Sequence, residues 1–214
     1  HGAPIERREP EQGDLDNSAV LVVDVGGEHE PGRGNFDHHQ FPRDHAPICA
    51  LSLVLQDLGL YEDAKMFCDW LAPAEWFDTR GAGGTAKWLG VDRDIISKLN
   101  SPMDVTLLRR FAQAERLDPG DLLYEMMRWV GEDLLEYLKT LRERIAYIDE
   151  HGELWTLEVS GADSFKVLFM PRTDPLPAEP SVGLGRYLDS IGESENVVGL
   201  VYPDRRGTGY GLSR

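Results

Sequence analysis

The sequence is poor in several features that would place it in a specialised class of protein. It holds only 2 cysteines in 214 residues. Both of them, Cys49 and Cys68, lie in apolar helical patterns, so we expect small buried thiols rather than a disulfide or a metal pair. No apolar run reaches the roughly 18 residues of a membrane span, and no signal peptide opens the chain. These absences predict a cytoplasmic protein with no membrane partner.

Positive charge is also scarce. The chain has 22 basic and 38 acidic residues, which gives a formal net charge of −16. Such a balance argues against binding of long nucleic acids through a broad basic face. It does not exclude a phosphate site in which metal ions supply the local positive charge. The expected partner is therefore a short single-stranded nucleic acid or a small phosphorylated substrate, and a homodimer stays open.

Between residues 20 and 40 the sequence has several acidic residues and histidines that could bind a ligand, close to short aliphatic segments. Residues 20–23 are all aliphatic and predict a strand buried on both faces. Asp24 ends this run before a pair of glycines, and the tip of a buried parallel strand is a common place for ligand chemistry. An Asp-His-His triplet at residues 37–39 then follows a short strand. Asp24 alone fits a turn or a helix cap, but three adjacent residues able to bind metal are hard to explain by packing.

These two motifs, VVDVGG at residues 22–27 and FDHHQ at residues 36–40, resemble those of the DHH-type phosphoesterases. More narrowly, they resemble the melanocyte-proliferating-gene family of metal-dependent hydrolases, whose best-studied members are described as exoribonucleases. The resemblance implies an α/β fold with three parts. These are a parallel-sheet DHH-like lobe over residues 1–118, a connecting helix over 119–150 and a smaller α+β C-terminal substrate lobe over 151–214.

The resemblance also implies a role for each matched residue. Asp24 would bridge two metal ions, and His38 and Asp78 would complete the ligand shell of one of them. His39 would face the substrate phosphate as a catalytic residue, and Asp37 would orient a histidine from behind. Oxygen and nitrogen ligands suit Mn²⁺, with Mg²⁺ as the alternative, better than they suit zinc held by thiolates.

A residue-level argument also supports Asp78. It is expected to end a helix that carries aromatic residues and to precede a glycine-rich loop over residues 81–85, whose amides could approach a phosphate. An acidic residue at a helix C-terminus opposes the helix dipole, which favours a function over a plain helix end. His45, in the loop after the triplet, is expected to be a surface histidine.

One motif of the family has no counterpart in these residues. The first His-x-x-x-Asp-x-Asp motif supplies the remaining ligands of the second metal, and the Asp-x-Asp at residues 14–16 lacks the histidine. The chain looks as though it begins at the end of the family's first helix, through truncation or true loss. We therefore expect it to hold one metal moderately and the second poorly, with weak or no activity unless that segment is supplied.

The C-terminal part of the chain has a different character. An apolar stripe between residues 122 and 145 fits one long helix whose stripe lies in the core. Alternation then predicts strands over residues 154–159, 165–170 and 197–202.

The chain finishes with arginines beside glycines. Such a composition suits close approach to an anion, and equally a tight β-hairpin. The resemblance favours a substrate-binding loop that includes Arg206, Gly207 and Gly209, although the histidine often found in that loop is missing.

The favoured function is hydrolysis of phosphodiester bonds by a Mn²⁺-dependent exonuclease or oligonucleotidase acting on short RNA or DNA. Two alternatives stay open: a non-catalytic metal-binding module that acts through protein contacts, and a pyrophosphatase-like hydrolase of small molecules. The acidic net charge slightly favours the latter, whereas the lack of a basic cluster in the C-terminal lobe counts against it. All three depend on one geometric expectation, which is that Asp24 and His38 converge on one divalent cation.

Overall fold

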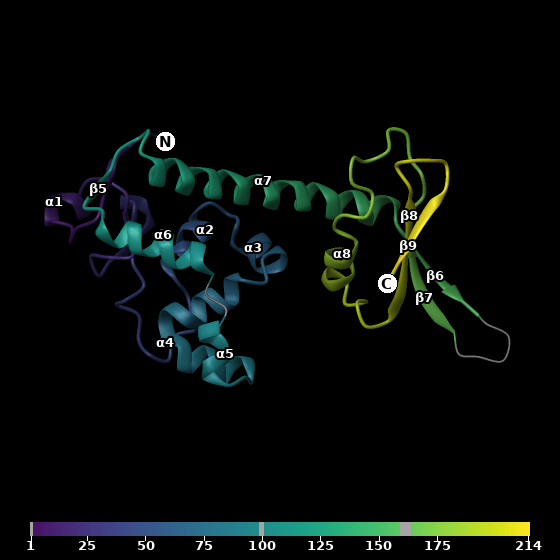
Figure 1. Cartoon of the computed structure of the whole chain (residues 1–214), viewed down its shortest axis with the longest axis horizontal. Coiled ribbons are helices and arrows are strands. Elements are labelled where there is room, and N and C mark those ends of the chain that lie inside the picture. The colour runs from purple at the N-terminus through teal and green to yellow at the C-terminus, as the bar shows by residue number, and fades with distance from the viewer. Residues whose placement is uncertain (1, 99–100, 159–163) are drawn as a thin grey trace. The chain divides into compact units, whose positions relative to one another are not determined.

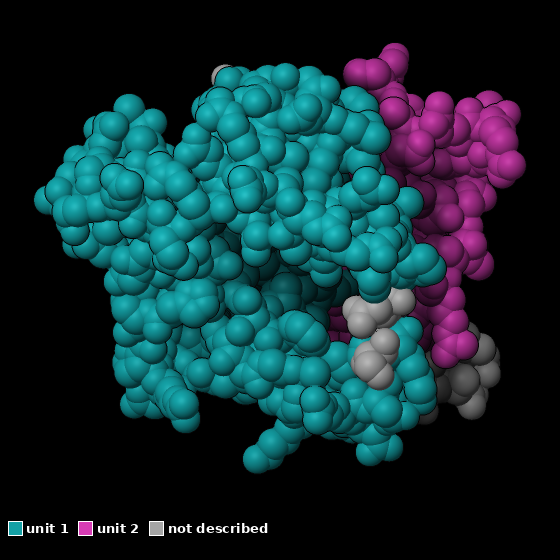
Figure 2. Space-filling view, turned by 60° about the vertical axis from the view of Figure 1, so that its left-hand side comes forward, with its two compact units in different colours: residues 1–135 teal, residues 136–214 magenta. Residues whose placement is uncertain are grey.

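The computed structural model describes residues 2–98, 101–158 and 164–214. The chain is mixed α/β and divides into two compact units, unit 1 over residues 1–135 and unit 2 over residues 136–214, which Figure 2 colours separately. The boundary falls inside the longest helix, α7, rather than in a loop (Figure 1). Across the described ranges, no helix combines the length and the apolar character that a membrane crossing requires.

Unit 1 is mainly helical, and its strands are only two residues long. Strands β1 and β5 pair antiparallel, while β2, β4 and β3 form a sheet in that order. The elements are β1 Ile5–Glu6, α1 Gln12–Leu15, β2 Val22–Val23, β3 His29–Glu30, the 3-10 turn η1 Pro31–Arg33, β4 Asn35–Phe36, α2 Ala50–Asp57, α3 Tyr61–Phe67, α4 Leu71–Leu89, α5 Arg93–Lys98, α6 Pro102–Gln113 and β5 Arg116–Leu117, followed by the first part of α7 Leu122–His151.

The strand expected at residues 20–23 is shorter and more exposed than its aliphatic run predicts. Only Val22 is buried, whereas Leu21 is 65% and Val23 is 39% exposed. The segment forms the edge strand β2, which pairs in parallel with β4, while β3 pairs antiparallel with β4 on the other side. The expectation of a strand covered on both faces is therefore wrong, because three strands of two residues offer too little sheet for two covering layers.

The apolar core of unit 1 fixes the strand that leads into the Asp-His-His triplet. Phe36 of β4 packs with Ile48 and Leu53, so that β4 lies against the start of α2. Cys49 and Cys68 are buried free thiols, as the sequence predicts. Because Phe36 is anchored in this core, the three polar residues that follow it leave the sheet at a fixed place.

The glycine-rich segment after Asp78 is helical and is not a loop, which corrects the expectation from composition. It lies in α4, and only Gly81 departs from helical geometry, with φ 66° and ψ 178°. Thr85 Oγ1 donates a hydrogen bond to the Gly81 carbonyl at 3.0 Å and stabilises the turn after this break. At Gly84 a Cβ atom would lie 2.4 Å from the Cβ of Arg80, so the close approach of the two turns requires glycine there.

Unit 2 is built on a single four-stranded sheet with the order β6-β7-β8-β9. The middle strands β7 and β8 run parallel and are joined through α8, while both outer pairs are antiparallel. Its core contains Ile148 of α7, Leu168 of β7 and Leu184 of α8, which places both helices against the same sheet (Figure 1). The elements that follow α7 are β6 Glu153–Leu157, β7 Phe165–Phe169, α8 Leu184–Ser190, β8 Val197–Pro203 and β9 Tyr210–Ser213.

The long helix and the three strands expected from periodicity are present, with three differences. The apolar stripe of α7 is buried at Leu138 and Leu141 but strongly exposed at Leu122 and Val130, so only part of it is core. Residue 159, at the end of the first expected strand, lies outside the described residues. The glycine-rich end of the chain forms a fourth strand. Strands β8 and β9 make an antiparallel hairpin, so the backbone of this segment has the β-hairpin form that was one of the two predicted alternatives.

Candidate metal centre

Three side chains from three elements of unit 1 meet at one point. Asp24 directly follows β2, His38 lies just after β4, and Asp78 lies in α4. The Nε2 atom of His38 is 3.2 Å from Asp24 Oδ1 and 2.9 Å from Asp78 Oδ2. Within the described part of the chain this buried nitrogen has no hydrogen bond of acceptable geometry, despite these two short distances. Both carboxylates therefore approach the same imidazole nitrogen at ion-pair distance without forming a hydrogen bond of acceptable geometry with it.

Local backbone geometry aims Asp24 at this point. Its N–H donates to the Phe36 carbonyl at 3.0 Å, which continues the parallel pairing of β2 with β4 by one residue. Asp24 then adopts φ 67°, and it is the single non-glycine residue with a positive φ in the described ranges. A left-handed backbone costs an L-residue roughly 1–2 kcal/mol, and aspartate and asparagine tolerate it better than most. Strain of this kind is concentrated at functional sites.

Asp37 fixes both the loop that contains Gly27 and the imidazole of His39. Its Oδ2 accepts a hydrogen bond from the Gly27 N–H at 2.6 Å, and its Oδ1 accepts one from the His39 N–H at 3.1 Å. The same Oδ1 lies 2.7 Å from His39 Nδ1. Both oxygens of this buried carboxylate are therefore engaged, which leaves Nε2 of the exposed His39 ring free to face a ligand.

The charges of the site perturb its protonation equilibria. The hydrogen bond to Asp37 is the main reason that the pKa of His39 lies above its ordinary value. Burial acts to raise the pKa of Asp37, but the hydrogen bonds from His39 and Gly27 together outweigh it, so that this pKa is lowered. Burial raises the pKa of Asp78; His38 opposes the rise and the Asp24 carboxylate adds to it. Two carboxylates thus lie close to one imidazole and to each other, which is an electrostatic environment that favours positive charge between them.

A buried hydrogen-bond network fixes the helix that carries Asp78. Glu75, one turn earlier in α4, accepts hydrogen bonds at its Oε1 from Ser52 Oγ at 2.7 Å and from Tyr61 OH at 2.8 Å. Burial, together with the hydrogen bond to Glu75, raises the pKa of Tyr61. Because Ser52 lies in α2 and Tyr61 in α3, this single carboxylate ties three helices together. It therefore fixes the position from which Asp78 reaches the site.

The donor set fits a divalent cation that prefers oxygen and nitrogen ligands. Ligand atoms of Asp24, Asp37, His38 and His39 all lie within 4.8 Å of one another, and Asp78 adds a carboxylate oxygen beside His38. Since Asp37 is engaged on both oxygens, the set best placed to hold a cation is Asp24, His38 and Asp78, while Nε2 of His39 stays free for a further ligand. Two carboxylates and one imidazole without thiolate suit Mn²⁺ or Mg²⁺ better than a structural zinc.

A pocket of about 180 Å³ adjoins the cluster within unit 1. The cluster contributes His38, His39 and Asp78 to its wall. The rest of the wall comes from the loop after the triplet and from α4, and consists of Phe41, Pro42, Arg43, His45, Ala46, Ile48, Thr79 and Arg80. His45 is exposed, as expected, yet it also lines this pocket.

Sequence reasoning missed Arg43 and Arg80 as neighbours of the cluster. Arg80 Nη2 donates to the His45 carbonyl at 2.6 Å, which joins α4 to the loop. The position of Arg80 two residues after Asp78 was a usable signal, whereas the contact with His45 depends on tertiary packing.

The residues expected to bind substrate in unit 2 are arranged differently. Arg206 is 90% exposed, and its guanidinium contacts only Asp204 within the described residues, at 3.3 Å. Gly207 and Gly209 offer their carbonyls to Arg172, whose Nη2 donates to them at 2.9 and 3.0 Å and to the Asp204 carbonyl at 2.9 Å. Arg172, which sequence reasoning did not single out, thus stabilises the backbone of this hairpin loop.

Comparison with known proteins assigns the chain to no family. No protein-family model, no curated protein and no solved structure matches it. Any functional interpretation therefore depends on the two sequence motifs and on the geometry of the cluster.

Proposed function

We propose that this chain is a metal-dependent phosphoesterase of the DHH type, with unit 1 as the DHH-like lobe and unit 2 as the substrate lobe. The substrate we propose is a short single-stranded nucleic acid, and the cation is Mn²⁺, with Mg²⁺ as the alternative. The observation that carries the proposal is that the carboxylates of Asp24 and Asp78 both approach His38 Nε2, which is buried and not hydrogen-bonded among the described residues.

In this proposal each residue of the cluster has a separate task. A divalent cation at such a site lowers the pKa of a bound water and balances negative charge on a phosphoryl group. Asp24, His38 and Asp78 hold it. His39 donates a hydrogen bond from Nε2 to a phosphate oxygen, which its raised pKa favours because the imidazolium carries a proton on both nitrogens. Asp37 fixes the ring of His39 through Nδ1 and acts as a positioning residue.

The strong negative charge of the chain is compatible with this site. At a net charge of −16 the surface does not attract long polyanions by itself, so the cation and nearby arginines must supply the attraction for phosphate. This favours a short substrate. The exposed Arg206 of unit 2 is proposed to contribute affinity for its phosphates, together with the amides of Gly207 and Gly209.

The test has two stages, both with the full chain. Calorimetric titration with Mn²⁺ measures binding, and we expect Asp24→Asn and His38→Asn to abolish one binding event while Asp204→Asn, a matched change on unit 2, leaves it intact. Hydrolysis of a short RNA, a dinucleotide and pyrophosphate with Mn²⁺ then measures chemistry, and we expect weak cleavage of the RNA. Cleavage that Asp24→Asn leaves untouched would refute the assignment. Binding of Mn²⁺ without cleavage of any of the three substrates would instead favour the non-catalytic module.

A further inference from the structure

The pocket beside the cluster combines three kinds of group in a small volume. Its wall includes residues of the proposed cation site, the two arginines Arg43 and Arg80, and the stacked rings of Phe41 and His45. At about 180 Å³ the pocket is smaller than the roughly 300–1,000 Å³ of sites that enclose a drug-sized ligand. Such a volume encloses only part of a nucleotide at a time, so it suits one terminal unit that is partly exposed rather than a length of polymer.

Arg43 and Arg80 supply the positive charge of this pocket. Arg43 is exposed and makes no hydrogen bond or ion pair with any other residue that the structure describes, so its guanidinium is available to a ligand. Arg80 is half-buried, and its hydrogen bond to the His45 carbonyl uses only part of its donor capacity. Planar guanidinium groups bind phosphate oxygens in pairs, which gives both affinity and orientation. The partner these two residues fit is a phosphate.

Phe41 and His45 add a flat surface. Their ring centroids lie 4.6 Å apart with the planes inclined by 25°. Phe41 also contacts His29 edge to face at 5.9 Å, and the His45 ring is fixed by a 2.7 Å contact between Nδ1 and the Ala46 carbonyl. One face of the His45 imidazole is therefore covered by Phe41, and the side chain is otherwise exposed. An oriented ring of this kind stacks well on a nucleobase, and such stacking tolerates any base.

We propose that this pocket is a subsite for a single terminal nucleotide, with Arg43 and Arg80 on its phosphate and His45, supported by Phe41, against its base. The inference rests on the proposed phosphoesterase function and narrows its substrate class. A nucleoside monophosphate unit uses both the guanidinium groups and the ring pair, whereas pyrophosphate uses the guanidinium groups alone.

The experiment is calorimetric binding of adenosine 5′-monophosphate, ribose 5-phosphate and pyrophosphate to the full chain, with and without Mn²⁺. We expect adenosine monophosphate to bind more tightly than ribose 5-phosphate. Arg43→Ala should weaken both by about tenfold, because one charged contact to phosphate is lost. Arg80→Lys, which keeps a donor for the His45 carbonyl, should have a smaller effect in the same direction. His45→Ala should reduce the preference for the nucleotide over the sugar phosphate by about fivefold or more.

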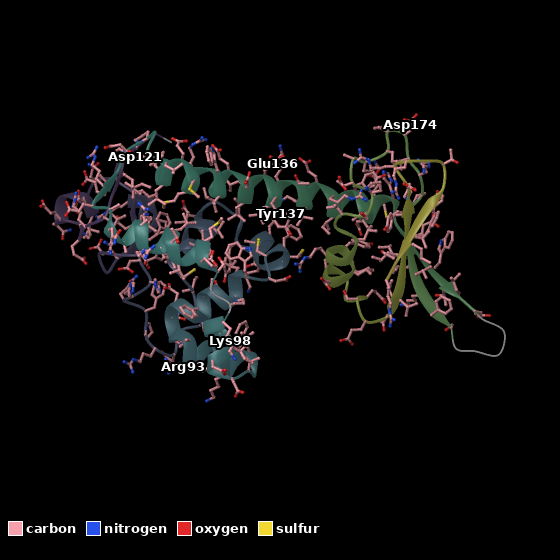
Figure 3. The ribbon with its side chains drawn as sticks, in the orientation of Figure 1. Arg93, Lys98, Asp121, Glu136, Tyr137 and Asp174 are labelled. Atoms are coloured by element: carbon pink, nitrogen blue, oxygen red, sulfur yellow. The ribbon has the colours of Figure 1, made fainter. Side chains whose placement is uncertain are left out.

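Arg93→Ala is the matched control, since Arg93 is an exposed arginine of α5 (Figure 3). It is not among the residues that line the pocket. The subsite is overturned if Arg43→Ala and Arg93→Ala affect nucleotide binding equally, or if pyrophosphate binds more tightly than the nucleotide. Nucleotide binding that depends on Arg43 in a chain that binds no Mn²⁺ would support the subsite and overturn the proposed catalytic function. The two hypotheses therefore fail separately.

Discussion

The two regions that the sequence singles out for chemistry are held in place in opposite ways. In the cluster of unit 1 a side chain is fixed by its contacts, since Asp37 is 2% exposed and both of its oxygens accept hydrogen bonds. In the loop over residues 204–209 of unit 2 the backbone is fixed by Arg172, and the Arg206 side chain projects into solvent. A fixed side chain can impose geometry on a ligand, whereas an exposed arginine must lose conformational entropy when it binds.

This difference implies a division of labour. The cluster is preorganised, so replacing one of its groups should change the chemistry or the metal affinity strongly. The loop contributes through its backbone and through flexible charge, so its side-chain variants should have modest effects. Pairs of matched substitutions, one in each region, test this contrast directly.

The largest effect is expected from Asp24→Asn. Loss of the carboxylate removes one of the three ligands, and we expect the affinity for Mn²⁺ to fall by at least about 100-fold, since even residues that only orient a ligand contribute about 10–100-fold. Asp204→Asn makes the same chemical change in the loop and should leave the affinity unchanged. Calorimetry with Mn²⁺ measures both. Equal effects of the two substitutions would contradict the contrast between the regions.

The second-largest effect is expected from replacing Asp37, which accepts hydrogen bonds from His39. Asp37→Asn removes the acceptor that raises the pKa of His39, so in the metal-free protein this pKa should fall toward its ordinary value of 6.5. Turnover should drop by about 10–100-fold. Proton NMR titration of the histidine ring signals measures the pKa, with the other histidines as internal references. A His39 pKa that stays raised in this variant would show that another group holds the imidazolium.

The same pair gives the metal-free protein a defined pH dependence. The pKa of Asp37 is lowered from 3.8, so its contribution to stability is present above that value and is lost as pH falls through the folded-state pKa. The pKa of His39 is raised from 6.5, so its contribution is present below 6.5 and is lost as pH rises through the folded-state pKa. The difference in unfolding free energy between wild type and Asp37→Asn should therefore be largest between these two values.

A smaller effect is expected in the loop of unit 2. Arg172→Ala removes the guanidinium that holds three carbonyls, and we expect a loss of about 1 kcal/mol, reduced from the usual value for charged hydrogen bonds because the group is exposed. Arg206→Ala should change stability by less, since that side chain is almost fully exposed. Urea unfolding of the full chain measures both. A larger loss for Arg206→Ala would mean that the loop depends on its side chains after all.

The smallest effect concerns Asp204. Its pKa lies below the ordinary 3.8, mainly through the hydrogen bond from the backbone N–H of Arg206 and then through the Arg206 side chain. Its contribution to stability is thus present above 3.8 and is lost as pH falls through the folded-state pKa. Because the main cause is a backbone group, Arg206→Ala should leave the pKa still lowered. Carbon-detected NMR of the carboxyl signal checks this, and a return to 3.8 would assign the effect to the side chain.

Sequence reasoning performed best where the decisive contacts are local. The contact between Asp37 and His39 spans two residues, and the family resemblance of the triplet was enough to predict that Asp37 orients a histidine. Two strands were predicted, one before Asp24 and one before the triplet, and the structure shows that they pair in parallel and that Asp24 donates its N–H to the Phe36 carbonyl. Asp78, far along the chain, needed the family resemblance as well.

Sequence reasoning performed worst where the structure depends on how many layers cover a strand or on contacts between residues far apart in the chain. The aliphatic run at residues 20–23 carries no information on how many layers cover a strand, and its sheet proved too small to be covered. Glycine composition over residues 81–85 predicted a loop, but tertiary packing overrides helix propensity there and confines the break to Gly81. The hydrogen bond between Arg80 and the His45 carbonyl joins residues far apart in the chain, and no periodic pattern in the sequence predicts it.

Helix starts illustrate the same rule on a smaller scale. Asp121 directly precedes α7, and its carboxylate accepts a hydrogen bond from the Asp118 N–H at 2.8 Å (Figure 3). The Pro-Gly-Asp sequence at residues 119–121 marked this helix start correctly. A turn closed by a contact between residues three apart can be predicted from the local sequence, whereas the burial of the helix that follows it cannot.

The left-handed backbone at residue 24 also constrains how this protein can change. Glycine and asparagine, besides aspartate, accept that conformation readily, and a β-branched residue does not. Asparagine or glycine at this position removes the charge while leaving the chain able to trace the same path. A substitution of Asp24 by asparagine or glycine would therefore remove one of the three proposed cation ligands without adding backbone strain at this position.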